Sequence, residues 1–168
     1  MGSVVYPACE IVKPGTIRHI AGNRFSLGEP EGSESDRLKF ISDILKTAGF
    51  RAPIQKNIRD EIWLKLIGNL SFNPISALTG ATLEQICNDQ GTEAIVRAMM
   101  TEAKIIAEEL GAKINMSIEK RIEGARKVGA HKTSMLQDIE AGKPIEIDSI
   151  IIAVKELGEL TCSPTPYI

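Results

Sequence analysis

The stretch that decides the fold is Trp63-Leu-Lys-Leu-Ile-Gly-Asn-Leu-Ser-Phe-Asn-Pro74, near the middle of the chain. We predict that it is helical, and Lys65, Asn69 and Asn73 recur every fourth residue within it. Four residues turn an α-helix by about 400°, so these side chains share one face with roughly 40° of drift per step. That face carries an ammonium group and two carboxamides among apolar neighbours. Such a row can hold a small polar molecule and give it a proton.

Each member of the row also has an ordinary interpretation. Lys65 could be a surface lysine whose aliphatic stem covers apolar neighbours. In the functional interpretation it lies in a partly dry cleft, where lost hydration would lower its pKa and make it a better acid near neutral pH. Asn73 precedes Pro74 and could cap the following segment. Asn69 and Asn73 would need partners or water if they are buried. Pro74 lacks a backbone donor and clashes with the preceding turn, so we expect a kink or a break there.

Composition narrows the class of protein. The 168 residues suffice for one ordinary domain or two small lobes, and 43% apolar with 25% charged residues is typical of a soluble globular protein. A net charge of −2 without a basic block argues against a nucleic-acid partner. The longest apolar run, residues 150–154, is far shorter than the about 20 residues that cross a bilayer. Cys9, Cys87 and Cys162 are widely spaced, which predicts no metal site and reduced thiols in the cytoplasm.

The first part of the chain is predicted to contain strands and one helix. Pro14-Gly15 marks a turn, and Gly22-Asn23 is a hairpin signal between strands at 16–21 and 24–27. Ser35 or Asp36 is expected to cap a helix that Gly49 ends.

From about residue 57 onward the sequence predicts helices almost throughout. Their expected N-terminal caps or boundaries are Thr92, Ser117, Ser134 and Pro144. The predicted class is therefore α+β, mainly α, with a division into residues 1–55 and 56–168. The few strands of the first part are too small for a complete nucleotide-binding domain, and neither GxGxxG nor GxxxxGK[ST] occurs.

Three polar residues between positions 131 and 146 are candidates either for helix capping and dipole interactions or for a place in a cleft. Ser134-Met-Leu-Gln137 has the form of a capping box, so Ser134 is expected as an N-cap. Glu146 lies in the first turn after Pro144, where a carboxylate suits the helix dipole. His131 precedes Ser134 and could line a cleft.

Two motifs together resemble the ketopantoate reductase (2-dehydropantoate 2-reductase) family. The first is the run from Trp63 to Pro74, and the second is Ser134-Met-Leu-Gln-Asp-Ile-Glu-Ala-Gly-Lys-Pro-Ile-Glu146-Ile-Asp148. The opening Val-Val-Tyr-Pro-Ala and the Arg24–Glu29 segment resemble the last strands of that family's Rossmann domain. Two separate motifs in the right order make the resemblance specific, and it covers essentially the whole chain.

The resemblance implies a role for each matching residue. Lys65 would be the catalytic general acid, Asn69, Asn73 and Ser134 would bind substrate, and Glu146 would lie where substrate and cofactor meet; no metal is implied. The implied fold is a helical C-terminal domain like that of 6-phosphogluconate dehydrogenase, preceded by strands and one helix left from a Rossmann domain. The implied reaction is NADPH-dependent reduction of ketopantoate, a 2-oxo acid, to pantoate in pantothenate biosynthesis.

The sequence also departs from the family's pattern. The Rossmann half with its glycine loop is absent, so we expect the 168-residue chain to bind NADPH weakly or not at all and to be inactive alone. Leu83 stands where some members have another substrate-binding asparagine. Two alternatives stay open: a non-catalytic helical module for oligomerisation, with a homodimer as its partner arrangement, and a related 2- or 3-hydroxy acid dehydrogenase. The choice between NADPH and NADH also stays open.

Overall fold

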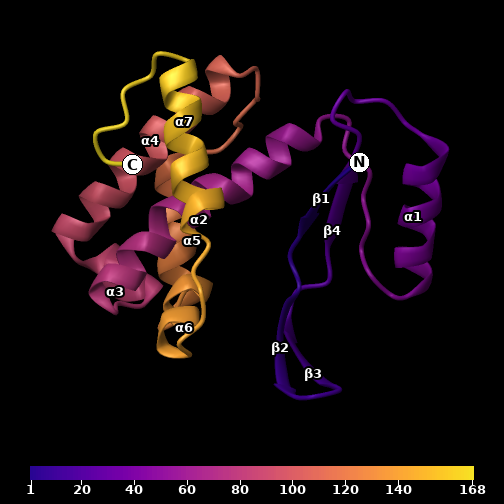
Figure 1. Ribbon diagram of the computed structural model, residues 1–168, viewed down its shortest axis with the longest axis horizontal. Coiled ribbons are helices and arrows are strands. Elements are labelled where there is room, and N and C mark those ends of the chain that lie inside the picture. Colours follow the sequence, from indigo (N-terminus) through magenta and orange to yellow (C-terminus); the bar gives the residue numbers. More distant parts are fainter. The chain divides into compact units, whose positions relative to one another are not determined.

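The computed structural model describes all 168 residues, which form two compact units, residues 1–62 and 63–168. The chain is mainly helical, and its strands all lie in the first unit (Figure 1). Helix α2 (Ile58–Thr79) begins in the first unit and continues into the second. None of the helices combines the length and the apolar composition that a membrane span requires.

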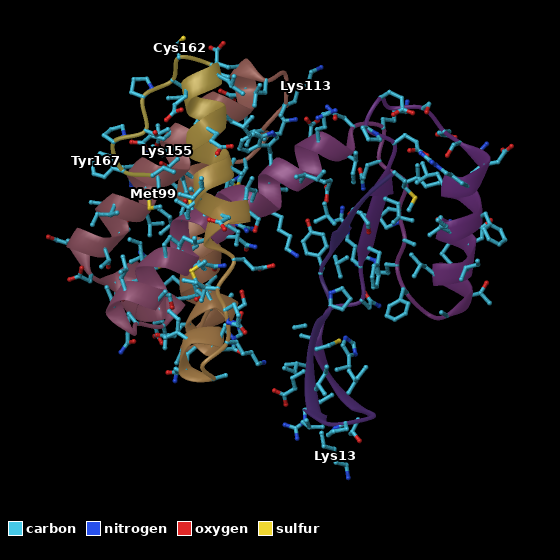
Figure 2. The ribbon with its side chains drawn as sticks, viewed as in Figure 1. Lys13, Met99, Lys113, Lys155, Cys162 and Tyr167 are labelled. Carbon is cyan, nitrogen blue, oxygen red and sulfur yellow. The ribbon has the colours of Figure 1, made fainter.

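The four short strands of the first unit pair into two antiparallel ribbons. β1 (Gly2–Val5) pairs with β4 (Phe25–Gly28), and β2 (Ala8–Lys13) pairs with β3 (Thr16–Ala21). The β2–β3 hairpin turns at Pro14-Gly15, next to Lys13 at its tip (Figure 2).

The hairpin predicted at Gly22-Asn23 is therefore wrong. Gly22 has φ +76°, but the strands on its two sides belong to different ribbons. A Cβ on Gly22 would lie 2.6 Å from the carbonyl oxygen of Tyr6, so glycine is required here by a close backbone contact. Glycine is favoured both in hairpin turns and where two backbone segments come close together, so the Gly-Asn pair alone does not distinguish the two cases.

A small parallel unit follows the ribbons. Helix α1 (Asp36–Thr47) begins after the N-cap Ser35, as predicted, and connects β4 to residues 51–55. These residues run parallel to β4, where Phe25 N donates to the carbonyl oxygen of Arg51 at 2.7 Å. Leu27, Leu38 and Ala52 form the core beneath this β–α–β arrangement.

The second unit is a bundle of helices around the C-terminal part of α2 (Figure 1). Its elements are α3 (Leu83–Asn88), α4 (Gln90–Glu109), α5 (Ile118–Val128), α6 (Ser134–Glu140), the π-helical turn η1 (Asp148–Ile152) and α7 (Ala153–Leu160). The core includes Ile67 and Leu70 of α2, Met100 and Ile106 of α4, and Val154 of α7. The predicted N-cap Ser117 and the closing Gly129 of α5 are confirmed.

Two helix boundaries differ from the prediction. The short helix α3 was not predicted, and α4 is capped by Asp89 instead of Thr92. The Asp89 carboxylate accepts a hydrogen bond from Thr92 N at 2.8 Å. A carboxylate placed before the first turn caps the helix and complements its dipole, which moves the start back by three residues.

Of the kink or break expected at Pro74, the break does not occur, because helix α2 continues through Pro74 to Thr79. Pro74 removes one backbone donor from the helix. Its neighbours Phe72, Asn73 and Ile75 are buried. Because tertiary packing supplies most of the stability of a protein helix, one lost hydrogen bond does not end α2. The two turns on either side of Pro74 therefore stay in one continuous element.

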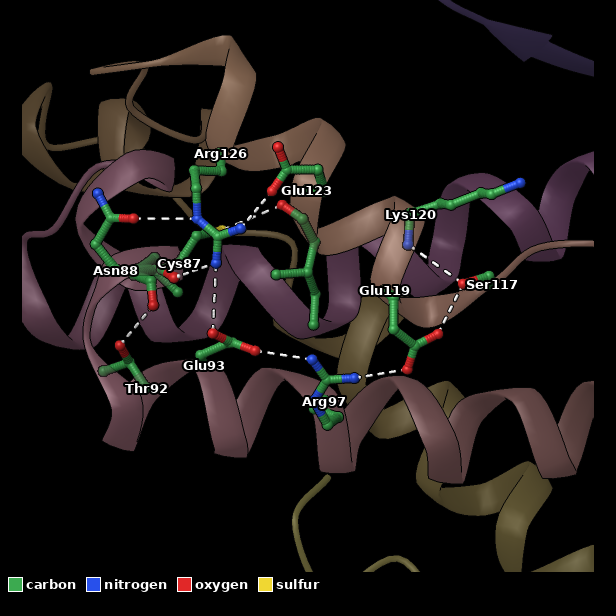
Figure 3. Close-up of polar contacts among 12 residues, drawn as sticks. Cys87, Asn88, Thr92, Glu93, Arg97, Ser117, Glu119, Lys120, Glu123 and Arg126 are labelled. Carbon is green, nitrogen blue, oxygen red and sulfur yellow. Dashed lines mark hydrogen bonds and ion pairs between the residues drawn. The ribbon is translucent and has the colours of Figure 1, made fainter.

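Arg126 of α5 connects three helices of the bundle (Figure 3). Its Nε donates to Asn88 Oδ1 at 3.1 Å, and its Nη2 donates to the carbonyl oxygen of Cys87 at 2.7 Å, both at the end of α3. The guanidinium also forms ion pairs with Glu93 of α4 and with Glu123 of its own helix. These contacts fix α5 against α3 and α4.

Candidate functional site

The helical face predicted from the Lys65 row is present on α2. Lys65 and Asn69 are half-buried, and Asn73 is only 6% exposed. The three side chains lie one turn apart because α2 is regular through this stretch. A nearly buried carboxamide is costly unless it finds a partner.

Neither carboxamide of the row has a partner among the protein's own groups. The side chains of Asn69 and Asn73 form no hydrogen bond to another residue. Structural asparagines normally satisfy their amides with backbone or side-chain groups. The amides of Asn69 and Asn73 are thus available to a bound molecule.

Both asparagines line a cavity of about 530 Å³ within the helical unit. We call it the α2–α5 cavity, because α2 and α5 supply most of its walls. Its lining residues are Gly68, Asn69, Phe72, Asn73, Leu83, Lys120, Arg121, Gly124, Ala125, Val128, His131, Thr133 and Ser134. A volume of this size, with an apolar side and a few polar groups, suits a small ligand.

The charges around the α2–α5 cavity are all of one sign. Lys120 and Arg121 line it, and no aspartate or glutamate does. Amide and hydroxyl groups of Asn69, Asn73 and Ser134 add neutral hydrogen-bonding groups. The cavity therefore favours a small anion over a neutral or cationic molecule.

Ser134 lines this cavity, but it is not the N-cap of α6 as predicted. The N-cap of α6 is Thr133, whose buried hydroxyl accepts a hydrogen bond from Leu136 N at 3.3 Å. Ser134 is the first residue of the helix, so the prediction of Ser134 as the cap is wrong. Because Thr133 performs the capping, the exposed side chain of Ser134 is not needed for it.

The loop before α6 is held in place by the start of α3. Leu83 N donates to the carbonyl oxygen of His131 at 2.9 Å, and Glu84 N donates to that of Gly129 at 3.3 Å. Two backbone donors at a helix N-terminus are satisfied in this way. The same bonds set His131 and Ser134 at the edge of the cavity, which agrees with the interpretation of His131 as a cleft residue.

Lys65 and Glu146 influence each other but do not belong to the cavity lining. Burial lowers the pKa of Lys65 below its ordinary value, and the negative charge of Glu146 acts in the opposite direction and raises it. Glu146 is exposed and lies just before the π-helical turn η1. Of the five predicted site residues, Asn69, Asn73 and Ser134 line the cavity. Lys65 lies one helical turn before Asn69 on α2, and Glu146 acts on it electrostatically.

Sequence reasoning missed Arg121, which lines the cavity from α5. A signal for it exists in the apolar stripe of that helix. Ile118, Ala125 and Val128 recur at helical spacing, and Arg121 occupies the intervening position three residues after Ile118. A cation inside an apolar stripe is a departure that marks a functional or packing role.

The passage from β4 to α1 does not fit the phosphate groups of a dinucleotide cofactor. In β–α–β units, phosphate groups bind where a strand passes into a helix N-terminus. Here that passage, from β4 to α1, contains Glu29, Glu31 and Glu34, and Glu29 is already bonded to Arg37 at 2.7 Å. Carboxylates at this position repel a pyrophosphate. No group of three or more acidic, histidine or cysteine side chains is arranged to hold a metal ion.

The amino-acid sequence is similar to those of known 2-dehydropantoate 2-reductases. The family profile described as ketopantoate reductase PanE/ApbA C terminal matches residues 57–168. A 2-dehydropantoate 2-reductase of Mesorhizobium japonicum is 56% identical over 168 residues, which is all of this chain and 52% of that protein. One of Archaeoglobus fulgidus is 29% identical and is covered to 54%. The chain thus spans about half the length of these curated relatives.

The fold is also similar to that of a solved 2-dehydropantoate 2-reductase structure. The crystal structure of 2-dehydropantoate 2-reductase from Methylococcus capsulatus superimposes with a TM-score of 0.91 at 32% identity, covering 98% of this chain and 57% of that one. The family match covers the whole helical unit, including both motifs and the α2–α5 cavity. The chain belongs to the family of ketopantoate reductase PanE/ApbA C-terminal domains.

Proposed function

We propose that this chain is the substrate-binding and proton-donating part of an NADPH-dependent 2-dehydropantoate 2-reductase, which reduces ketopantoate to pantoate. The observation that carries the proposal is the pair of unpartnered carboxamides, Asn69 and Asn73, in a cavity without carboxylates. Ketopantoate is a small anion with a keto group, a hydroxyl group and an apolar branch. Family membership and the 56% identical relative support the same reaction.

The hydride of this reaction would come from NADPH. Because the acidic β4–α1 passage does not fit the cofactor, we assign the holding of NADPH to residues other than those of this chain. Glu146 is the one residue here proposed to lie near the cofactor, where it would position the substrate or the nicotinamide ribose. The expectation that the 168-residue chain is inactive alone follows from the same misfit.

Three residues of the chain would orient the substrate. Asn69 and Asn73 would direct hydrogen bonds to its hydroxyl and carbonyl groups, and Ser134 would donate to its carboxylate. Holding a reactant in one geometry removes orientational entropy before the chemical step. The apolar residues of the cavity, Phe72 and Leu83 among them, would receive the branched carbon.

Lys65 would supply the proton. As the keto carbon is reduced, negative charge grows on its oxygen, and an ammonium group nearby stabilises that charge and protonates it. Partial burial strengthens this electrostatic effect and lowers the pKa of Lys65 toward the range where a lysine is a useful acid. The charge of Glu146 keeps enough of Lys65 protonated for the role.

Turnover of ketopantoate by a full-length protein, in which a dinucleotide-binding domain accompanies these residues, tests the proposal. Lys65→Ala should lower kcat by about 10²–10⁴-fold, because the general acid is lost. Lys155→Ala, an exposed lysine on α7 (Figure 2), is the matched control and should leave kcat unchanged. Full kcat in the Lys65 variant would contradict the assignment. The same assay with a panel of 2-oxo and 3-oxo acids separates this reaction from that of a related hydroxy acid dehydrogenase.

We also propose that the protein works in the cytoplasm. The structure contains three free cysteines, at positions 9, 87 and 162, and two of them are exposed. Exposed thiols persist in reducing compartments and are rare in oxidising ones.

A further inference from the structure

We propose that Arg121 binds the carboxylate of the ligand in the α2–α5 cavity, and that Gly68 provides the space its guanidinium occupies. The proposal rests on the proposed function and names the residue that makes the site selective for an acid. Ser134 would then be a second, neutral partner of the same carboxylate.

The contact between Arg121 and Gly68 is unusually close. A Cβ on Gly68 would lie 2.2 Å from Nη2 of Arg121 and 3.0 Å from both its Cζ and its Nε. The guanidinium therefore rests against the backbone of α2, and any larger residue at position 68 would displace it. Glycine is unfavourable inside a helix relative to alanine, so its presence in the middle of α2 has a packing reason.

This contact sets the guanidinium beside the proposed substrate row. Gly68 is the immediate neighbour of Asn69, and both line the cavity with Arg121. Arg121 itself belongs to the first turn of α5, where its N–H donates to the carbonyl oxygen of the N-cap Ser117 at 3.1 Å. The α2 backbone and the capped start of α5 thus hold the charge from two sides, and Arg121 is half-buried as a result.

The chemistry of the cavity identifies its ligand as a carboxylate. The planar guanidinium presents several donors in a fixed arrangement that matches the two oxygens of a carboxylate. The residues that line the cavity include no aspartate or glutamate. Phe72, Ala125 and Val128 form an apolar side that a carbon skeleton can cover. Partial burial also weakens screening by salt, which makes the charge more selective than that of an exposed lysine.

Calorimetric titration of the 168-residue chain with ketopantoate and with its uncharged methyl ester tests this inference. Arg121→Gln should weaken binding of the acid by about 10- to 100-fold and leave binding of the ester unchanged. Arg121→Lys should give a smaller loss, because the charge stays and the paired donors are lost. Gly68→Ala should reproduce part of the loss without touching the charge. The matched control is Lys127→Ala on the same helix, which is exposed and outside the cavity lining.

Thermal melting of each variant separates lost binding from lost folding. Equal binding of the acid by wild type and Arg121→Gln would overturn the inference, as would an equal loss of acid and ester in a variant that melts normally. Failure of the unsubstituted chain to bind the acid would overturn it too.

Full-length protein distinguishes this inference from the proposed function. There Arg121→Gln should raise KM for ketopantoate with little change in kcat, since the residue binds and does not react. Turnover that depends on Lys65 but not on Arg121 would contradict the role of Arg121 and leave the proposed function intact. Arg121-dependent binding of pyruvate by a protein that does not reduce ketopantoate would sink the proposed function alone.

Discussion

At the scale of single residues, the proposed chemistry of the site rests on Lys65 and Glu146. Burial of Lys65 lowers its pKa, and the charge of Glu146 opposes part of that change. In the proposed role of Lys65 as a general acid, this balance would let it hold its proton at the working pH and release it to the substrate.

The pH dependence of turnover follows from this balance. Glu146→Gln removes a negative charge that favours the protonated form, so the pKa of Lys65 should fall further below its ordinary value. A step that needs the ammonium group is lost as pH rises through that pKa. The alkaline limb of the profile of kcat/KM should therefore move to lower pH in full-length protein. Glu156→Gln, an exposed glutamate of α7, should leave the limb in place; a limb that moves upward in the Glu146 variant would contradict the coupling.

At the scale of elements, the position of α5 determines the shape of the cavity. This helix contributes Lys120, Arg121, Ala125 and Val128 to the lining. Arg126 holds it against the C-terminal end of α3 and against α4 (Figure 3). The buried core beneath includes Ile122, which packs with residues of α2 and α4. The α5 wall of the cavity is therefore held in position by the polar contacts of Arg126, which does not itself line the cavity.

Loss of Arg126 should destabilise the helical unit. Arg126→Ala leaves the carbonyl oxygen of Cys87 without its donor at 2.7 Å, and the expected cost is about 1–3 kcal/mol in the free energy of unfolding. Chemical denaturation measures it. The neighbouring Lys127 forms only an exposed ion pair with Glu123, so Lys127→Ala should change stability by less than about 0.5 kcal/mol. Equal effects of the two substitutions would contradict the role of Arg126.

Local chemistry made several helix ends predictable. Ser35, Ser117 and Gly129 act through side chains and backbone angles of the nearest few residues, which the sequence displays directly. Thr92 and Ser134 failed as caps because Asp89 and Thr133 offered better-placed oxygens one to three residues earlier. Competition between neighbouring caps is decided by geometry that spacing alone does not contain.

Tertiary contacts account for the remaining differences. Pro74 does not end α2 because buried neighbours hold it, and Gly22 serves a contact with Tyr6 instead of a hairpin. The spacing of Asn69 and Asn73 predicted their shared face, but the cavity beside them is formed by α5 and the loop before α6. Arg121 interrupts the apolar stripe of α5, which marks it as a departure, but only the packing of α5 against α2 shows that it lines this cavity.

At the scale of the whole molecule, the features on which the proposed function rests all lie in the second unit. Residues 63–168 hold a core of their own, the unpartnered amides and the cationic cavity. Residues 1–62 hold strands and one helix with an acidic passage where phosphate would bind. The homodimer that the family resemblance leaves open stays a prediction, and a light-scattering mass tests it.

The central claim is that this chain grips the 2-oxo acid but does not bind the hydride donor. Parallel calorimetric titrations of the 168-residue chain with ketopantoate and with NADPH test it most directly. We predict binding of ketopantoate that Asn73→Ala weakens and Asn115→Ala, at an exposed position, does not, together with weak or no binding of NADPH. Micromolar binding of NADPH, or ketopantoate binding that is indifferent to Asn73, would contradict the account.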